Sequence, residues 1–228
     1  MSIDSGSDLV PRLKVRIESL SDLVFGLALS IGSLTLIGKP LPTGLSDLVS
    51  DVLYFGFSFV IIVMTWLGYS RTISVLPVEN SSALFLNIIL LFCVALEPYL
   101  FYVLISTQVV TLAEYYSYSS IAYYSSIAYA LDVGVMFLVL ATLARLLVKE
   151  EKYLGKERHR VHPDVLKRFK RVMIFEYLVG AIFIASALPI FWIPTPIGAL
   201  RFDLWYSSFV MFVGLRVRPR REETKVPA

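Results

Sequence analysis

Apolar residues are grouped along this chain into six long blocks, which short polar or charged stretches separate. A helix needs roughly 20 mostly apolar residues to cross the hydrocarbon core of a bilayer. The pattern therefore predicts an all-α integral membrane protein with six transmembrane helices. The last of them is expected to be shorter and partly interfacial, because Arg201 and Asp203 interrupt it. The predicted spans are residues 20–38, 50–69, 82–105, 121–147, 172–193 and 197–215.

The composition of the chain agrees with this pattern. The chain is 57% hydrophobic and 17% charged, whereas a soluble domain has about 45–50% apolar and about 25% charged residues. The first block follows a polar stretch, and no A-x-A cleavage pattern comes after it, so we expect a retained helix rather than a signal peptide. The single cysteine, Cys93, excludes an intrachain disulfide. We therefore expect a multi-pass protein of the cell membrane.

Lysine and arginine residues gather on one side of the predicted bundle. If the N-terminus is cytoplasmic, only Lys39 and Arg201 of the 21 basic residues fall on the opposite side. Basic residues favour the cytoplasmic side of membrane proteins, and an even number of spans returns the chain to its starting side. We therefore expect both termini in the cytoplasm. There the basic side faces the anionic leaflet of the bilayer, which explains its charge without a nucleic-acid partner.

The charge distribution also divides the chain into parts. We expect a cytoplasmic N-terminal segment over 1–19, a six-helix transmembrane domain over 20–215 and a basic cytoplasmic tail over 216–228. A basic cytoplasmic linker over 149–171 separates the first four predicted spans from the last two. Pro163, inside this linker, is a helix-start signal.

A short repeat stands at the outer end of the fourth predicted span. The sequence YSSIAY occurs at Tyr118–Tyr123 and again at Tyr124–Tyr129. Tyrosine favours the headgroup region of a bilayer, so the repeat is typical of an interfacial belt. A binding role is the less ordinary alternative.

The first predicted helix carries an aliphatic stripe. Leu27, Ile31 and Leu34 are spaced by four and three residues, so they share one face, and Ser30 and Gly26 lie close to it. Such a stripe usually packs into a core. In a symmetric oligomer it can instead line a pore, where rings of leucine or isoleucine gate by dewetting. Periodicity alone leaves both interpretations open.

The start of this helix carries a family signature. The sequence R-I-E-S-L-S-D at Arg16–Asp22 resembles the R-x-x-x-F-S-D motif of the transmembrane protein 175 family, the endolysosomal potassium channels and their prokaryotic single-repeat relatives. Residues Ser58–Trp66 and Phe85–Leu100 resemble the second and third helices of that family. Two features depart from it: Leu20 replaces the motif's phenylalanine, and Leu67–Arg71 replaces a histidine-rich helix exit.

The resemblance implies a potassium-preferring cation channel, built as a homotetramer with the first helices around a central pore. Leu27 would form the narrowest apolar ring, and Ile31 and Leu34 would form further rings toward the outside. Ser30 would supply the pore hydroxyl that influences the preference for potassium. No carbonyl filter of the T-V-G-Y-G kind occurs in the sequence, so selectivity would come from side chains and pore width.

The same resemblance places the polar signature outside the pore. Arg16, Ser21 and Asp22 would form a polar network that holds helices together. A simpler interpretation of Asp22 is an N-terminal cap that complements the helix dipole.

Three further carboxylates lie within apolar blocks, and an intramembrane carboxylate marks a functional site by default. Glu97 precedes Pro98, where we expect the helix to kink, so Glu97 would lie at a break in the helix. Glu176 lies one turn beyond the basic linker, where we expect it to pair with a basic residue such as Arg171. For Glu97 and Asp132, structural pairing and a role in ion or proton coupling both remain open.

Catalytic and metal chemistry have little support in the sequence. The only histidines, His159 and His162, lie in the basic linker, away from any cluster with metal-ligand spacing. We therefore expect no enzyme activity, no metal site and no cofactor. Three classes remain: a cation channel, which we favour; a carrier that couples ions or protons through Asp132 and Glu97; and a non-conducting membrane scaffold.

Overall fold

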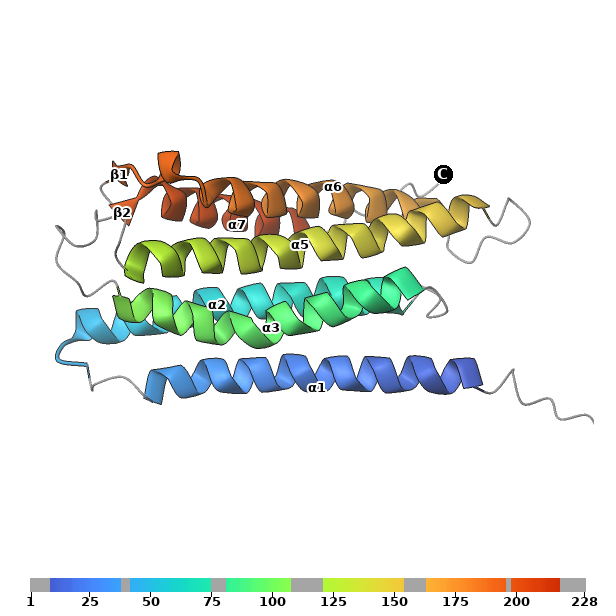
Figure 1. Cartoon of the computed structure of the whole chain (residues 1–228), viewed down its shortest axis with the longest axis horizontal. Coiled ribbons are helices and arrows are strands. Elements are labelled where there is room, and N and C mark those ends of the chain that lie inside the picture. The colour runs from blue at the N-terminus through green and yellow to red at the C-terminus, as the bar shows by residue number, and fades with distance from the viewer. Residues whose placement is uncertain are drawn as a thin grey trace, which may run out of the picture.

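The computed structural model describes residues 9–37, 42–74, 81–107, 121–153, 163–195 and 198–217. These residues form long α-helices that lie side by side (Figure 1). The only β-structure among them is a short antiparallel hairpin of β1 (Pro194–Thr195) and β2 (Gly198–Ala199), which follows a 3₁₀ turn at Pro189–Phe191. The expected all-helical architecture is thereby confirmed. The helices are α1 (Leu9–Ile37), α2 (Leu45–Ile73), α3 (Ser81–Thr107), α5 (Ile121–Tyr153), α6 (Pro163–Ser186) and α7 (Leu200–Val217).

The first four helices have the properties of membrane spans. Within the described residues, four helices are long and apolar enough to cross a bilayer: Val15–Leu36, Leu45–Ile73, Ser81–Ser106 and Ile121–Lys149. Helices α6 and α7 stand where the fifth and sixth spans were expected. Helix α6 begins at Pro163 and ends at Ser186, before Pro189, because proline disfavours helical backbone in the residue that precedes it.

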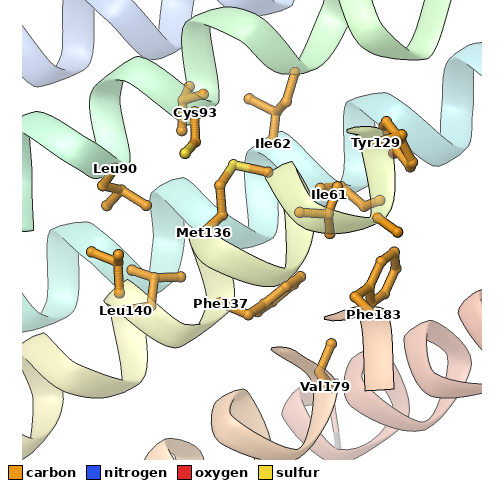
Figure 2. Packing of buried hydrophobic residues seen from close by; sticks show 14 of the residues in the cluster. Ile61, Ile62, Leu90, Cys93, Tyr129, Met136, Phe137, Leu140, Val179 and Phe183 are labelled. Carbon is orange, nitrogen blue, oxygen red and sulfur yellow. The ribbon is translucent and has the colours of Figure 1, made fainter. Parts of the chain in front are cut away.

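Helix α5 is the centre of the bundle. Figure 2 shows Met136, Phe137 and Leu140 of α5 among side chains of α2, α3 and α6. The apolar window of α5 is 61% buried, whereas that of α1 is only 22% buried. Most of the core therefore surrounds α5, and α1 lies at the edge of the protomer.

Two glycines bring α5 and α6 close together. A Cβ atom added at Gly180 would lie 2.9 Å from the carbonyl oxygen of Gly134, and one added at Gly134 would lie 2.6 Å from Cγ1 of Ile184. Small residues at a helix crossing let the two backbones approach, which is a common way of packing helices in a bilayer.

The tyrosine repeat is more than an interfacial belt. Tyr124 is exposed, but Tyr123, Ser126 and Tyr129 are buried. A guanidinium nitrogen of Arg201 donates to Ser126 Oγ at 2.6 Å, and the guanidinium carbon lies 4.4 Å from the ring centre of Trp192. These three residues therefore contact other elements of the chain, and their place in an interfacial belt stays a prediction. Residues 118–120 lie outside the described part of the chain.

Arg201 also has a role that hydropathy did not predict. It was expected to interrupt the last apolar block, but it is fully buried in the first turn of α7. Its guanidinium also lies 5.3 Å from the ring centre of Tyr123. Stacking on aromatic rings stabilises a cation that has left water.

Candidate functional site

Helix α1 has one packed face and one open face. The packed face consists of Ser21, Phe25, Ala28 and Gly32, all buried, at successive spacings of four, three and four residues. This spacing keeps the four residues on one side of a helix. They lie where α1 packs on α2 and α3.

The predicted aliphatic stripe lies on the opposite, open face. Leu27 is 57% exposed, Ile31 37% and Leu34 60%. Ser30 is exposed beside them. The packing of α1 therefore presents all four proposed pore residues away from the core of the protomer.

The open stripe is longer than the sequence analysis proposed. Leu20 and Leu23 are also exposed and extend it by two turns toward the start of α1. Leu20, Leu27 and Leu34 are spaced by seven residues, and this heptad spacing is a signal of a continuous apolar seam. Leu20 was read only as a departure from the family motif, which is why its place on the seam was missed.

The hydroxyl of Ser30 has a defined hydrogen bond. Ser30 Oγ donates to the carbonyl oxygen of Gly26 at 2.8 Å. A hydroxyl carries one donor and two acceptor lone pairs, so donation to the backbone leaves the oxygen free to accept or to contact a cation. An added Cβ at Gly26 would meet no atom within 4 Å, so the open face next to Ser30 is uncrowded.

The polar signature joins α1 to α2. Ser21 Oγ lies 2.6 Å from the hydroxyl of Tyr69, in a buried contact. Ser21 Oγ also donates to the carbonyl oxygen of Ile17 at 2.8 Å, and it has one proton only, so Tyr69 acts as the donor to Ser21. One turn earlier in α2, Trp66 Nε1 donates to Asp22 Oδ1 at 2.8 Å. Neighbouring signature residues thus contact two residues on one face of α2.

The interpretation of Asp22 as an N-terminal cap is wrong. Helix α1 begins at Leu9, so Asp22 lies well inside the helix, where the backbone N–H groups are already bonded. Its carboxylate instead accepts a hydrogen bond from α2. Arg16 lies on α1 and is exposed, and its place in a polar network stays a prediction.

A second polar cluster lies inside the bundle. Glu97 of α3 is fully buried. Ser58 Oγ of α2 lies 2.9 Å from both of its carboxylate oxygens and shares its one proton between them, and the hydroxyl of Tyr129 of α5 donates to Oε1 at 3.2 Å. Glu97 therefore connects three helices. Asp132, one turn after Tyr129, is also buried.

Glu97 does not stand at a helix break. Helix α3 continues through Pro98 to Thr107. An interruption of the helix at Glu97 is therefore wrong, whereas a kink at Pro98 stays a prediction. The role of Glu97 follows from its contacts with Ser58 and Tyr129.

Glu176 and the two histidines are the remaining polar residues that the sequence analysis considered. Glu176 is buried on α6. His159 and His162 lie outside the described residues. In the described part of the chain, no group of three or more histidine, cysteine, aspartate or glutamate side chains is placed to hold a metal ion.

These features define a class of protein. Long apolar helices pack around a central helix, and a peripheral helix presents an aliphatic face with a hydroxyl away from the core. This architecture is that of a multi-pass helical membrane protein.

Comparisons with known proteins match part of the chain to one family and most of its fold to solved structures. Residues 16–98 match the model of the family described as "Endosomal/lysosomal potassium channel TMEM175". The crystal structure of a lysosomal potassium-selective channel TMEM175 homologue from Chamaesiphon minutus has the same fold, with a TM-score of 0.58 at 18% identity over 91% of this chain and 100% of that one. A variant of the potassium channel MtTMEM175, solved with a nanobody–MBP fusion, gives a TM-score of 0.54 at 18% identity over 88% and 91% of the two chains. No curated protein matches this chain.

Residues 16–98 thus resemble the TMEM175 family, and this stretch includes the signature at Arg16–Asp22. The matched residues cover the polar signature, the open stripe of α1, all of α2 and most of α3. The two solved structures share the fold over nearly the whole chain. The family is one of ion channels rather than enzymes.

Proposed function

We propose that this protein is a potassium-preferring cation channel, in which copies of α1 from a homotetramer surround a central pore. The observation that carries the proposal is the open face of α1, where Leu27, Ile31 and Leu34 are exposed although the opposite face is packed. One chain supplies one such face, so a closed pore requires a symmetric assembly. The match to a potassium-channel family supports the same assignment.

The side chains of the stripe suit a hydrophobic constriction. In a symmetric assembly, Leu27 would form the narrowest ring, and Ile31 and Leu34 would form the rings that follow it along α1. Narrow rings of aliphatic side chains block ions by excluding water. Widening the ring by truncation should therefore increase ion flow.

Ser30 is the proposed selectivity residue. Its hydroxyl proton is donated to the backbone of the same helix, so its oxygen is oriented as an acceptor. Hydroxyl oxygens from several protomers would offer a partly dehydrated cation a weak set of ligands. Weak ligands and a narrow pore favour potassium, because potassium loses its water more readily than sodium.

The charges at the bundle ends support a cytoplasmic location of both termini. Helices α1, α3 and α6 begin, and α2 and α5 end, at the same end of the bundle (Figure 1). Arg71, Arg145 and Lys149 lie at this end, and all three are exposed. Basic side chains favour the cytoplasmic face, so we assign this end to the inside.

Flux into proteoliposomes tests the channel directly. We would measure potassium and sodium uptake for the wild type, Leu27→Ala and Asp132→Asn. A channel of the proposed kind conducts potassium faster than sodium, changes its rate or selectivity in Leu27→Ala, and tolerates Asp132→Asn. Absence of flux from a correctly folded and assembled protein would instead favour a non-conducting scaffold.

The buried carboxylates keep a carrier as the second candidate. Glu97 and Asp132 are both buried in the interior of the protomer, which is where carriers place coupling groups. However, the carboxylate of Glu97 is occupied by Ser58 and Tyr129, and such contacts favour a structural role. Slow, saturable flux that Asp132→Asn abolishes would establish the carrier.

A further inference from the structure

A groove lies between α3 and α5 at the basic end of the bundle. It offers about 440 Å³ and is lined by Phe85, Leu86 and Leu146 together with three hydroxyl residues, Ser81, Ser82 and Thr142. Ser81 and Ser82 are the first residues of α3. The groove therefore has an apolar wall and a polar end.

Two basic residues lie on the face of α5 that lines this groove. Thr142, Arg145, Leu146 and Lys149 fall at spacings that place them on one face of α5. Arg145 and Lys149 are exposed, and they lie on the same face as the lining residues. Among the described residues that line the groove, none carries a carboxylate.

We propose that this groove binds a phospholipid with an anionic headgroup, with an acyl chain against Phe85, Leu86 and Leu146 and the phosphate near Arg145 and Lys149. A basic pocket between transmembrane helices on the cytoplasmic side is the arrangement that holds anionic headgroups. A lipid suits both halves of the groove, whereas free phosphate would leave the apolar wall exposed. The proposal uses the inside orientation given above and does not depend on ion conduction.

Tryptophan quenching by brominated lipid tests this proposal. The full chain carrying Phe85→Trp is reconstituted in phosphatidylcholine vesicles that contain a small fraction of brominated phosphatidylglycerol or, in parallel, brominated phosphatidylcholine. The quenching of the unsubstituted chain, which has three tryptophans, is measured in the same vesicles and subtracted. The matched control is Phe92→Trp, on the same helix, because Phe92 is 67% exposed and Phe85 64%, but only Phe85 lines the groove. Both lipids occupy both leaflets, so the result does not depend on orientation.

The lipid site predicts a headgroup preference at position 85 only. Each cation near an anionic group should strengthen binding about fivefold, so brominated phosphatidylglycerol should quench Phe85→Trp at a several-fold lower mole fraction than brominated phosphatidylcholine. Phe92→Trp should respond equally to both. Equal quenching by the two lipids at position 85 would overturn the proposal.

Charge variants then locate the headgroup. Combining Phe85→Trp with Arg145→Gln and Lys149→Gln should abolish the preference. Combining it with Lys170→Gln and Arg171→Gln, two exposed residues of α6, should leave the preference intact. If the α6 pair removes it equally, the preference comes from the general charge of this end and the proposed site is wrong.

Discussion

The contact between Ser21 and Tyr69 should fix the rotation of α1 against α2, and a double-mutant cycle can measure its strength. Tyr69→Phe removes only the hydroxyl that lies 2.6 Å from Ser21 Oγ. The ring of Tyr69 packs on Phe25 with centroids 5.8 Å apart, and phenylalanine keeps that packing. Because Ser21 still donates to the carbonyl oxygen of Ile17, the substitution leaves no buried donor without a partner.

The expected magnitude follows from the buried position of this bond. Hydrogen bonds between transmembrane helices contribute about 0.6 kcal/mol on average and up to about 1.7 kcal/mol. The Ser21–Tyr69 contact is short and buried, so we expect a coupling energy of about 1 kcal/mol between Ser21→Ala and Tyr69→Phe. Ser21→Ala alone should lower the free energy of unfolding by less than the loss of a buried hydrogen-bond partner usually does. The reason is that Asn87 of α3 is a second polar group near the Tyr69 hydroxyl.

The assay is equilibrium unfolding in mixed micelles of mild detergent and dodecyl sulfate, followed by the loss of helical circular dichroism. The four proteins of the cycle give the coupling energy, and Tyr99→Phe, on an exposed tyrosine of α3, is the control for loss of a tyrosine hydroxyl. Its effect should stay within about 0.5 kcal/mol. A coupling energy below about 0.3 kcal/mol would refute the reasoning, because independent sites add within that margin.

Three further substitutions test the packing of the protomer. Gly180→Ala should lower the free energy of unfolding by about 1–3 kcal/mol, since its Cβ would lie 2.9 Å from a backbone oxygen. The control is Gly56→Ala, which should be neutral or stabilising in the same assay because nothing lies within 4 Å of its added Cβ. Glu97→Leu should lower the free energy of unfolding by about 1–3 kcal/mol for each hydroxyl that it leaves unpaired. Glu97→Gln keeps an acceptor and should lower it by less. Equal losses of stability in the two variants would contradict the hydrogen-bonded cluster. Arg201→Lys should lower the midpoint of thermal unfolding although the charge is kept, because lysine cannot reproduce the stacked guanidinium; an unchanged midpoint would argue against the aromatic contacts.

The positions of the helices could be predicted from hydropathy because long apolar blocks mark the spans. The third block, 82–105, became Ser81–Thr107, and the fourth, 121–147, became Ile121–Tyr153. Hydropathy missed the starts of α1 and α6, since these helices extend into charged sequence that a hydropathy window excludes. The start of α6 was signalled instead by Pro163, where the helix begins. A helix outside the hydrocarbon core needs no apolar residues, so its true end leaves no hydropathy signal.

Side-chain contacts between helices were harder to predict. The signature residues Ser21 and Asp22 were found from the family motif, but their partners Tyr69 and Trp66 depend on how α2 is rotated against α1. Periodicity within one helix does not give that rotation. Arg201 was misread for the same reason, because its aromatic neighbours come from α5 and from the segment before α7.

The two faces of α1 make opposite predictions for substitutions two positions apart. Phe25 is 2% exposed and packs on Tyr69, so Phe25→Ala should cost about 3–5 kcal/mol of unfolding free energy. Leu27 contributes little to the core of the protomer, so Leu27→Ala should change that free energy by less than about 0.5 kcal/mol while it changes ion flux. If Leu27→Ala destabilises the protein as much as Phe25→Ala does, the stripe is a packing surface rather than the wall of an ion path. A Leu27→Ala protein that is fully stable but altered in potassium flux would separate the face that folds the protomer from the face that conducts.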